Sequence, residues 1–332
     1  MTTGGRNGLV RRAWAVWASG ALCVLASAGC SQPGTGADAG GDNAPGGAVT
    51  SPAAAPGTGK PGTGKPSGAA AGTEDGAGAA DHPALATARI NVADGQTIGV
   101  GMPVSITFAR PVPAAQRADV ERALAVTTSP RTTGGWSWIK DRNLHDGQRI
   151  DYRPPAFWKP ATKISVRAGG HLNRQVTVGR SLVATVDVRT HTMTVAEDGR
   201  ERRVPITAGA PGMDTWNGTM VVSDKQRRVW MDSRTVDYGD AYRGYYNYAV
   251  HLTASGTYLH ENPKAGANAG RRNITHGCIG LAADGTARRF FDSVIPGDVI
   301  RVVGSKETVD AGNGYGDWNL GWDQWTAGSA LA

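Results

Sequence analysis

The 332-residue chain contains only three cysteines, Cys23, Cys30 and Cys278. It also lacks runs of charge: 35 basic residues outnumber 28 acidic ones, and the surplus of +7 is spread along the chain. No basic stripe is interleaved with aromatic residues, so the sequence argues against a nucleic-acid partner. Aromatic residues are nearly absent from the first eighty positions, where Gly, Ala and Pro are concentrated. A packed core is therefore expected only beyond about residue 87.

The N-terminus carries the pattern of an export signal. Its arginines are Arg6, Arg11 and Arg12, and the apolar stretch after them runs from Ala13 to Gly29. This order is typical of a secretory signal peptide. Small residues directly before Cys30 are similar to a lipoprotein processing site, although Ser27 stands where an aliphatic residue is usual. We expect residues 1–30 to be a signal peptide with a lipobox, Cys30 to be lipidated, and the chain to be held at the outer face of the cell membrane. Ordinary cleavage after Ala28 is the alternative.

Residues 31–86 consist mainly of Gly, Ala, Pro, Ser, Thr and Asp, with a Gly-Thr-Gly-Lys-Pro unit repeated at 57–61 and 62–66. A segment of this composition buries too little apolar surface to offset its conformational entropy. The sequence predicts a disordered linker between the anchor and the folded part.

Two β-rich regions come after the linker. Short runs with alternating apolar residues, such as Lys163–Arg167, predict half-buried strands over residues 87–180, with one helix at Ala114–Leu124. The size and texture of this region favour an immunoglobulin-like β-sandwich. Residues 181–304 predict a second β-rich domain, so the fold class is mainly β. The C-terminal extension, residues 305–332, has three tryptophans at helical spacing, which are expected to pack on the body as one apolar face. They are Trp318, Trp322 and Trp325.

Cysteine counting leaves one thiol in the folded part. Cys23 lies in the segment to be removed and Cys30 would carry the lipid, so Cys278 has no cysteine to pair with. Exported proteins usually pair their cysteines, and an unpaired one calls for an explanation other than a disulfide. A buried, inert Cys is one possibility. The other is a nucleophile.

The surroundings of Cys278 favour the nucleophile. A thiol attacks a carbonyl as thiolate, which requires a base nearby and donors for the oxyanion. His260 ends a strand-like run eighteen residues upstream, His276 lies two residues away, and Gly277 permits a tight turn that would aim backbone N–H groups at a substrate. A helix expected over 282–294 would lower the thiol pKa through its N-terminal dipole.

The segment Thr275-His276-Gly277-Cys278, together with the upstream His260, resembles the active-site signature of L,D-transpeptidases. Residues 248–256 look like the strand and turn before the family's catalytic His. The ending Gly316–Trp325 is similar to the extension of the actinobacterial members, and the preceding sandwich looks like their immunoglobulin-like domain. The resemblance covers about residues 88–328.

The resemblance implies a role for each residue of the site. Cys278 would be the nucleophile, His260 its base and His276 an orienting group, while Thr275 and the N–H groups of Gly277 and Cys278 would position the oxyanion. A backbone carbonyl near the His, at Gly256 or Glu261, would complete the site. Four tyrosines near Gly239 and Gly244 are candidates for a mobile lid. They are Tyr238, Tyr242, Tyr245 and Tyr246.

The resemblance also implies the reaction and the partners. The enzyme would join diamino-acid residues of two peptidoglycan stem tetrapeptides through a Cys278 thioester and release D-Ala, with no cofactor and no metal. The linker would let it reach into the cell wall, and carbapenem β-lactams would inhibit it. Two positions depart from the family pattern: Gly280 replaces the usual Asn or Arg, and His251 a frequent Arg, which predicts a missing polar contact and an altered substrate affinity.

Other functions fit less well. Papain-type peptidases place Cys before His, and sortases place Thr directly before Cys. A zinc site from His260, His276 and Cys278 lacks a fourth ligand. Two alternatives remain. A hydrolytic L,D-carboxypeptidase would use the same site, and a non-catalytic wall-binding lipoprotein would have the same location.

Overall fold

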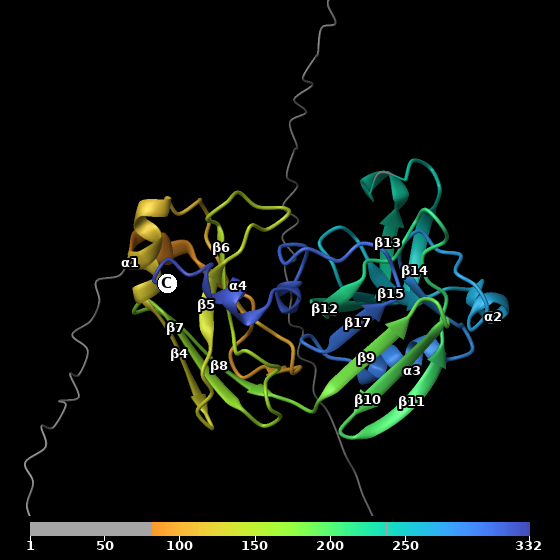
Figure 1. Ribbon diagram of the computed structural model, residues 1–332, viewed down its shortest axis with the longest axis horizontal. Coiled ribbons are helices and arrows are strands. Elements are labelled where there is room, and N and C mark those ends of the chain that lie inside the picture. Colours follow the sequence, from red (N-terminus) through yellow and green to blue (C-terminus); the bar gives the residue numbers. More distant parts are fainter. Residues whose placement is uncertain (1–81, 237) are drawn as a thin grey trace, which may run out of the picture. The chain divides into compact units, whose positions relative to one another are not determined.

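The computed structural model describes residues 82–236 and 238–332 (Figure 1). The expected signal peptide at 1–30, with Cys30, and the linker up to residue 81 lie outside the described residues. Within the described part of the chain, no helix is both long and apolar enough to cross a membrane.

The first β-rich region forms two four-stranded sheets with one core between them. One sheet has the order β1 (Arg89–Ile90), β3 (Val104–Thr107), β6 (Arg149–Arg153), β5 (Gly135–Trp138). The other has the order β2 (Thr97–Ile98), β8 (Leu172–Val178), β7 (Lys163–Ala168), β4 (Leu124–Ser129). In β7, buried residues alternate with exposed ones as the apolar pattern predicted. The helix expected at 114–124 is shorter and mixed, with a 3-10 turn η2 (Ala114–Gln116) leading into α1 (Arg117–Arg122), because Leu124 already begins β4. A further 3-10 turn, η1 (Pro83–Thr87), precedes β1 and places Leu85 in the core. Residues 83–86, which were expected to belong to the disordered linker, are therefore part of the folded region.

The second β-rich region contains a five-stranded and a four-stranded sheet. The five-stranded sheet has the order β11 (Arg200–Pro205), β10 (Thr192–Glu197), β9 (Leu182–Asp187), β17 (Val299–Val303), β12 (Gly218–Val221). The four-stranded sheet has the order β13 (Asp224–Asp232), β14 (Arg243–His251), β15 (Tyr258–Glu261), β16 (Ile279–Leu281). The 3-10 turn η3 (Ser233–Val236) comes after β13, and α2 (Ala265–Asn268) comes after β15. A single apolar core fills this region, and α3 (Thr286–Ser293) contributes Phe290 and Phe291 to it.

The C-terminal segment packs on the body through two short helices, η4 (Asp317–Asn319) and α4 (Trp322–Thr326). The single helical face expected for the tryptophans is wrong, because the chain is extended at Leu320 and Gly321 between the helices. The three indole rings instead surround one cation: the guanidinium carbon of Arg153 lies 4.3–5.7 Å from their centroids. Each contact is of cation–π type, which is strongest where the cation is desolvated. This arrangement ties the segment to strand β6.

Candidate active site

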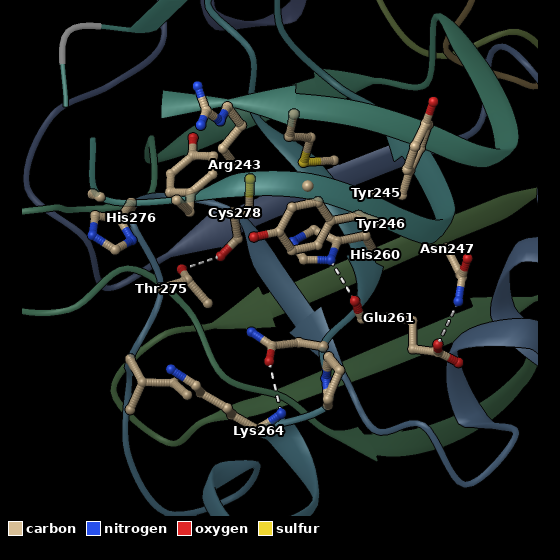
Figure 2. Close-up of a pocket in the computed structure, with 17 residues that line it drawn as sticks. Arg243, Tyr245, Tyr246, Asn247, His260, Glu261, Lys264, Thr275, His276 and Cys278 are labelled. Carbon is tan, nitrogen blue, oxygen red and sulfur yellow. Dashed lines mark hydrogen bonds between the residues drawn. The ribbon is translucent and has the colours of Figure 1, made fainter. Parts of the chain in front are cut away.

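Parallel pairing of two short strands brings His260 and Cys278 together. In β15 and β16, Leu259 pairs with Ile279 and His260 with Gly280, so Cys278, which directly precedes β16, comes next to the end of β15 that precedes His260 (Figure 2). Both side chains line one cleft of about 430 Å³. Two side chains eighteen positions apart in the sequence thus line the same cleft.

His260 is held in one tautomer. Its ring is almost fully buried, and Nδ1 lies 2.6 Å from the backbone carbonyl oxygen of Glu261. A carbonyl oxygen only accepts, so Nδ1 carries the proton and Nε2 remains an unprotonated acceptor. Burial lowers the pKa of His260 to about 4, while the bond to Glu261 opposes that shift. The imidazole is therefore neutral at physiological pH and available as a base.

Cys278 is a neutral thiol in the resting structure. Burial raises its pKa to about 11, and the backbone N–H of Tyr258 opposes this. The expectation of a lowered pKa was wrong, because the residues directly after Cys278 form strand β16 and the next helix, α3, begins only at Thr286. The Sγ atom lies 3.9 Å from the carbonyl oxygen of Gly256. The two carbonyls considered from the sequence thus have different partners: Glu261 contacts the imidazole and Gly256 the thiol.

The turn before Cys278 is fixed by its own side chains and by glycine. Thr275 Oγ1 donates to the carbonyl oxygen of Cys278 at 2.6 Å, and the backbone N–H of Thr275 donates to Ala208. Gly277 has φ +108°, a conformation that L-residues rarely adopt. Within the described chain, no residue accepts a hydrogen bond from the N–H of Gly277 or Cys278. These two donors are available to a ligand.

Three of the four tyrosines expected to form a lid contact the histidines of the site. The rings of Tyr238 and Tyr242 lie 5.6 Å and 5.2 Å from that of His276, and Tyr246 lies 4.8 Å from His260. Burial raises the pKa of Tyr242 to about 12, and the neighbouring Cys278 adds to this shift. His276 is thus packed against Tyr238 and Tyr242 rather than hydrogen-bonded to His260.

Tyr245 differs from the other three. It reaches the rim of the cleft, but its side chain is 59% exposed and its ring packs on Trp230. Figure 2 shows its side chain pointing away from Cys278, whereas the ring of Tyr246 lies against His260.

Gly280 occupies a crowded position. A Cβ there would lie 2.8 Å from Thr207 Cγ2 and 3.0 Å from Asn262 Cβ, so no larger residue fits without movement. The carboxamide of Asn262, which lines the cleft, fills the space next to Gly280. The missing polar contact expected at Gly280 stays a prediction, with the carboxamide of Asn262 as the nearest polar side-chain group to that position.

His251 does not line the cleft. Its Nδ1 lies 2.8 Å from Asp224 and its ring stacks on Tyr258 at 4.4 Å. Sequence reasoning also missed several lining residues. They are Met231, Arg243, Asn247, Asn262, Lys264 and Ile274. Only Asn262 and Lys264, close behind His260 in sequence, carried a signal that could have found them.

Together the fold and the site define a two-domain β protein with a buried thiol beside a neutral imidazole, an arrangement suited to acyl transfer. Comparison with known proteins makes the class specific. Residues 78–170 match the model of a bacterial Ig domain, and residues 181–303 match that of the L,D-transpeptidase catalytic domain. The chain belongs to the L,D-transpeptidase family, as the Thr275–Cys278 segment predicted.

Relatives share both sequence and fold with this chain. It is 33% identical to L,D-transpeptidase 2 of Mycobacterium tuberculosis over 72% of this chain, a match that spans only 61% of that relative's length. It is 34% identical to L,D-transpeptidase 1 of the same species, over 67% of this chain and 86% of the relative. A solved structure of LD transpeptidase LdtMt1 in complex with imipenem superposes with a TM-score of 0.58 at 34% identity, covering 65% of this chain and 97% of that one.

The geometry of the thiol gives a testable pH dependence. Alkylation of Cys278 by iodoacetamide is expected to accelerate about tenfold per pH unit between about pH 6 and pH 10, because a pKa of about 11 leaves only about one thiolate in 10⁴ at neutral pH. The rate can be followed by intact-protein mass spectrometry in a chain carrying Cys23→Ser and Cys30→Ser. A rate that is flat from about pH 5 to 8 would instead indicate a preformed thiolate–imidazolium pair.

Proposed function

We propose that this chain is an L,D-transpeptidase that crosslinks peptidoglycan stem peptides, with Cys278 as nucleophile and His260 as general base. The observation that supports this most strongly is the pairing of a buried thiol with an imidazole whose Nδ1–H is held by the Glu261 carbonyl, in one cleft. That hydrogen bond leaves Nε2 free to accept the thiol proton.

In the first step, Sγ of Cys278 attacks the carbonyl carbon that comes after the L-centre of the diamino acid in a donor tetrapeptide. Both groups are neutral at rest, since burial raises the thiol pKa and lowers the imidazole pKa. Proton transfer to His260 therefore accompanies the attack rather than preceding it. The C–N bond to D-Ala then breaks, the imidazolium returns the proton to the leaving amine, and a thioester remains.

The oxyanion formed in this step needs hydrogen-bond donors. The N–H groups of Gly277 and Cys278, which have no acceptor within the described residues, are the donors we propose. Thr275 would hold them in place through its bond to the Cys278 carbonyl. His276, packed against Tyr238 and Tyr242, would keep the lid over the thioester.

In the second step, the side-chain amine of a diamino acid in a neighbouring stem attacks the thioester. The amine loses a proton to His260, the C–S bond breaks, and the thiol is regenerated by that proton. The product is an amide between two diamino-acid residues. These steps need neither a metal nor an organic cofactor.

The site and its expected location suit one biological setting. We propose that the chain acts outside the cell, anchored to the membrane through a lipid on Cys30, as the N-terminal sequence predicts. We also propose that carbapenems acylate Cys278, since LD transpeptidase LdtMt1, which shares this fold, has been solved in complex with imipenem.

Incubation of the full chain with purified disaccharide tetrapeptides tests this proposal. We expect free D-Ala and a dimer whose mass equals two monomers less one D-Ala, with the new bond between two diamino acids in tandem mass spectrometry. A matched donor stem with a D-configured third residue should give neither product. Release of D-Ala without dimer would favour the hydrolytic carboxypeptidase, and absence of both, with retained binding to wall material, would favour the non-catalytic wall-binding protein.

A further inference from the structure

The hairpin formed by β13 and β14 presents two different faces. Near its tip, buried or half-buried residues alternate with exposed ones on both strands, as expected for strands with one covered face. Met231 and Tyr246 line the cleft from the inner face. Trp230 and Tyr245, their neighbours in sequence, point to the outer face, where they are 52% and 59% exposed.

The two exposed rings form one unit. Trp230 and Tyr245 are directly paired across the strands, and their ring centroids lie 5.0 Å apart in an edge-to-face arrangement. The guanidinium carbon of Arg228, two residues before Trp230 on the same face, lies 3.9 Å from the Tyr245 ring. We call these three residues the outer aromatic patch. They combine the apolar faces of two rings with a guanidinium whose N–H groups can donate hydrogen bonds to a ligand.

The outer aromatic patch is too small for a stable protein interface. Two aromatic side chains about half exposed offer roughly 200–300 Å², whereas a specific protein partner covers about 800 Å² on each side. The patch suits a smaller, ring-shaped ligand. A pyranose sugar has an apolar C–H face that packs on an aromatic ring and peripheral hydroxyl and amide groups that accept hydrogen bonds from a guanidinium.

The position of the patch indicates which molecule carries the sugar. Tyr245 belongs both to the patch and to the rim of the cleft that holds Cys278 and His260. In peptidoglycan the stem peptide is attached to an N-acetylated sugar of the glycan strand, so a stem in the cleft carries its sugars to the rim. We propose that Trp230, Tyr245 and Arg228 bind the glycan strand of the peptidoglycan substrate. This inference rests on the function proposed above.

The tryptophans of the first domain do not offer an equivalent surface. Trp158 is fully buried and donates its Nε1–H to the Met102 carbonyl at 2.8 Å, and Trp136 is packed against Tyr152 in the same core. Trp230 is the most exposed tryptophan in the described chain.

A binding experiment tests the patch without requiring catalysis. The full chain and a Trp230→Ala/Tyr245→Ala variant would be mixed with purified glycan strands from which all stem peptides have been removed. We expect the wild type to bind and the variant to bind about tenfold more weakly. Trp230→Phe, which keeps a ring, should stay within about threefold of wild type. Equal binding by wild type and the double variant would overturn the proposal, and so would absence of wild-type binding.

A kinetic experiment separates sugar recognition from lid function. Trp230→Ala, which leaves Tyr245 at the rim of the cleft in place, should show about a tenfold higher KM for a disaccharide tetrapeptide donor, with unchanged turnover of the free tetrapeptide and unchanged imipenem acylation. Arg228→Gln should weaken the disaccharide donor alone. Arg227→Gln is its matched control, since it makes the same charge change on the other face of the strand.

Two outcomes of these measurements would count against a glycan site, and a third would count against the proposed function. An equal loss on both donors would assign the rings to lid stability. A dimer of the wild-type chain that the double variant abolishes, seen by sedimentation, would assign them to self-association. If the wild type turns over neither donor, the proposed function fails, and the stem-free strands alone decide the role of the patch.

Discussion

Replacement of Cys278 by Ala is expected to lower the rate of crosslink formation by at least about 10³-fold while leaving the fold intact. In the proposed mechanism, the thiol of Cys278 forms the covalent intermediate with the substrate. Cys278 is small and buried beside the carbonyl of Gly256, so the change removes one sulfur atom and little packing. Crosslinked dimer can be quantified by liquid chromatography and mass spectrometry, and imipenem should leave no adduct on the variant.

Cys278→Ser sharpens this test. A hydroxyl is far less acidic than a thiol, and an imidazole whose pKa is about 4 is a weak base for it, so we expect the Ser variant to be about as inactive as the Ala variant. Unfolding midpoints within about 2 °C of wild type would show that the fold is preserved. Persistent dimer formation by the Ala variant would refute the thioester mechanism, whatever the Ser variant does.

The sequence could predict that His260 and Cys278 lie close together, but it could not predict the pKa of the thiol. The Thr275–Cys278 segment and the upstream His predicted that two side chains eighteen residues apart would meet. The state of the thiol depends on the structure of the next three residues. Ile279-Gly280-Leu281 reads as a lead into a helix, yet Gly280 exchanges two backbone hydrogen bonds with Thr207, at 2.7 Å and 3.0 Å. This long-range partner makes the segment a strand, and burial then raises the pKa that a helix would have lowered.

The sequence was equally unable to predict which tyrosines lie near the site. The four tyrosines between residues 238 and 246 stand at both even and odd positions. Because side chains alternate between the two faces of a strand, the face on which each tyrosine lies depends on where the strand begins. Only the observed start of β14 at Arg243 places Tyr246 over His260 and Tyr245 on the outside. Composition could predict a tyrosine-rich flap but not which tyrosines cover the thiol.

Strand β6 was the least predictable element. Its sequence, Arg149 to Arg153, alternates polar and apolar residues and reads as half-exposed, but all five residues are buried. The polar ones contact the C-terminal segment, 160 or more residues later in the chain. Arg149 Nη1 donates to the carbonyl oxygen of Gly314 at 2.9 Å, and Arg153 donates to that of Leu320 at 2.8 Å. No local pattern encodes such contacts.

Arg149 is at the centre of a buried ionic cluster. It forms a two-point salt bridge with Asp151 and donates to Asp141 at 2.7 Å, while a carboxylate oxygen of Asp317 lies 3.8 Å away. Burial opposes its charge, but Asp151 and Asp317 raise the pKa of Arg149 well above its usual value. Burial, and then the charge of Asp151, raise the pKa of Asp317 well above its usual value. Without its cation, this cluster would hold carboxyl groups that neither water nor a partner compensates.

Arg149→Met is therefore expected to destabilise the protein by about 3–5 kcal/mol, the range for breaking a buried ion pair from one side. The expected readout is a lower urea midpoint, together with faster proteolysis after residue 305 as the C-terminal segment detaches. Arg122→Met, which removes an exposed pair with Asp119 of the same 2.7 Å length, should cost at most about 1 kcal/mol.

Detachment of the C-terminal segment should also disturb the active site. Asn313 in that segment binds both the N–H and the hydroxyl of Ser255. Ser255 directly precedes Gly256, whose carbonyl oxygen contacts Cys278. The Arg149 variant is thus expected to lose imipenem acylation rate although it touches no residue of the cleft, and Arg149→Met/Asp151→Asn should recover part of the stability by removing the uncompensated charge. An Arg149→Met variant as stable as Arg122→Met would show that the cluster contributes nothing to holding the C-terminal segment in place.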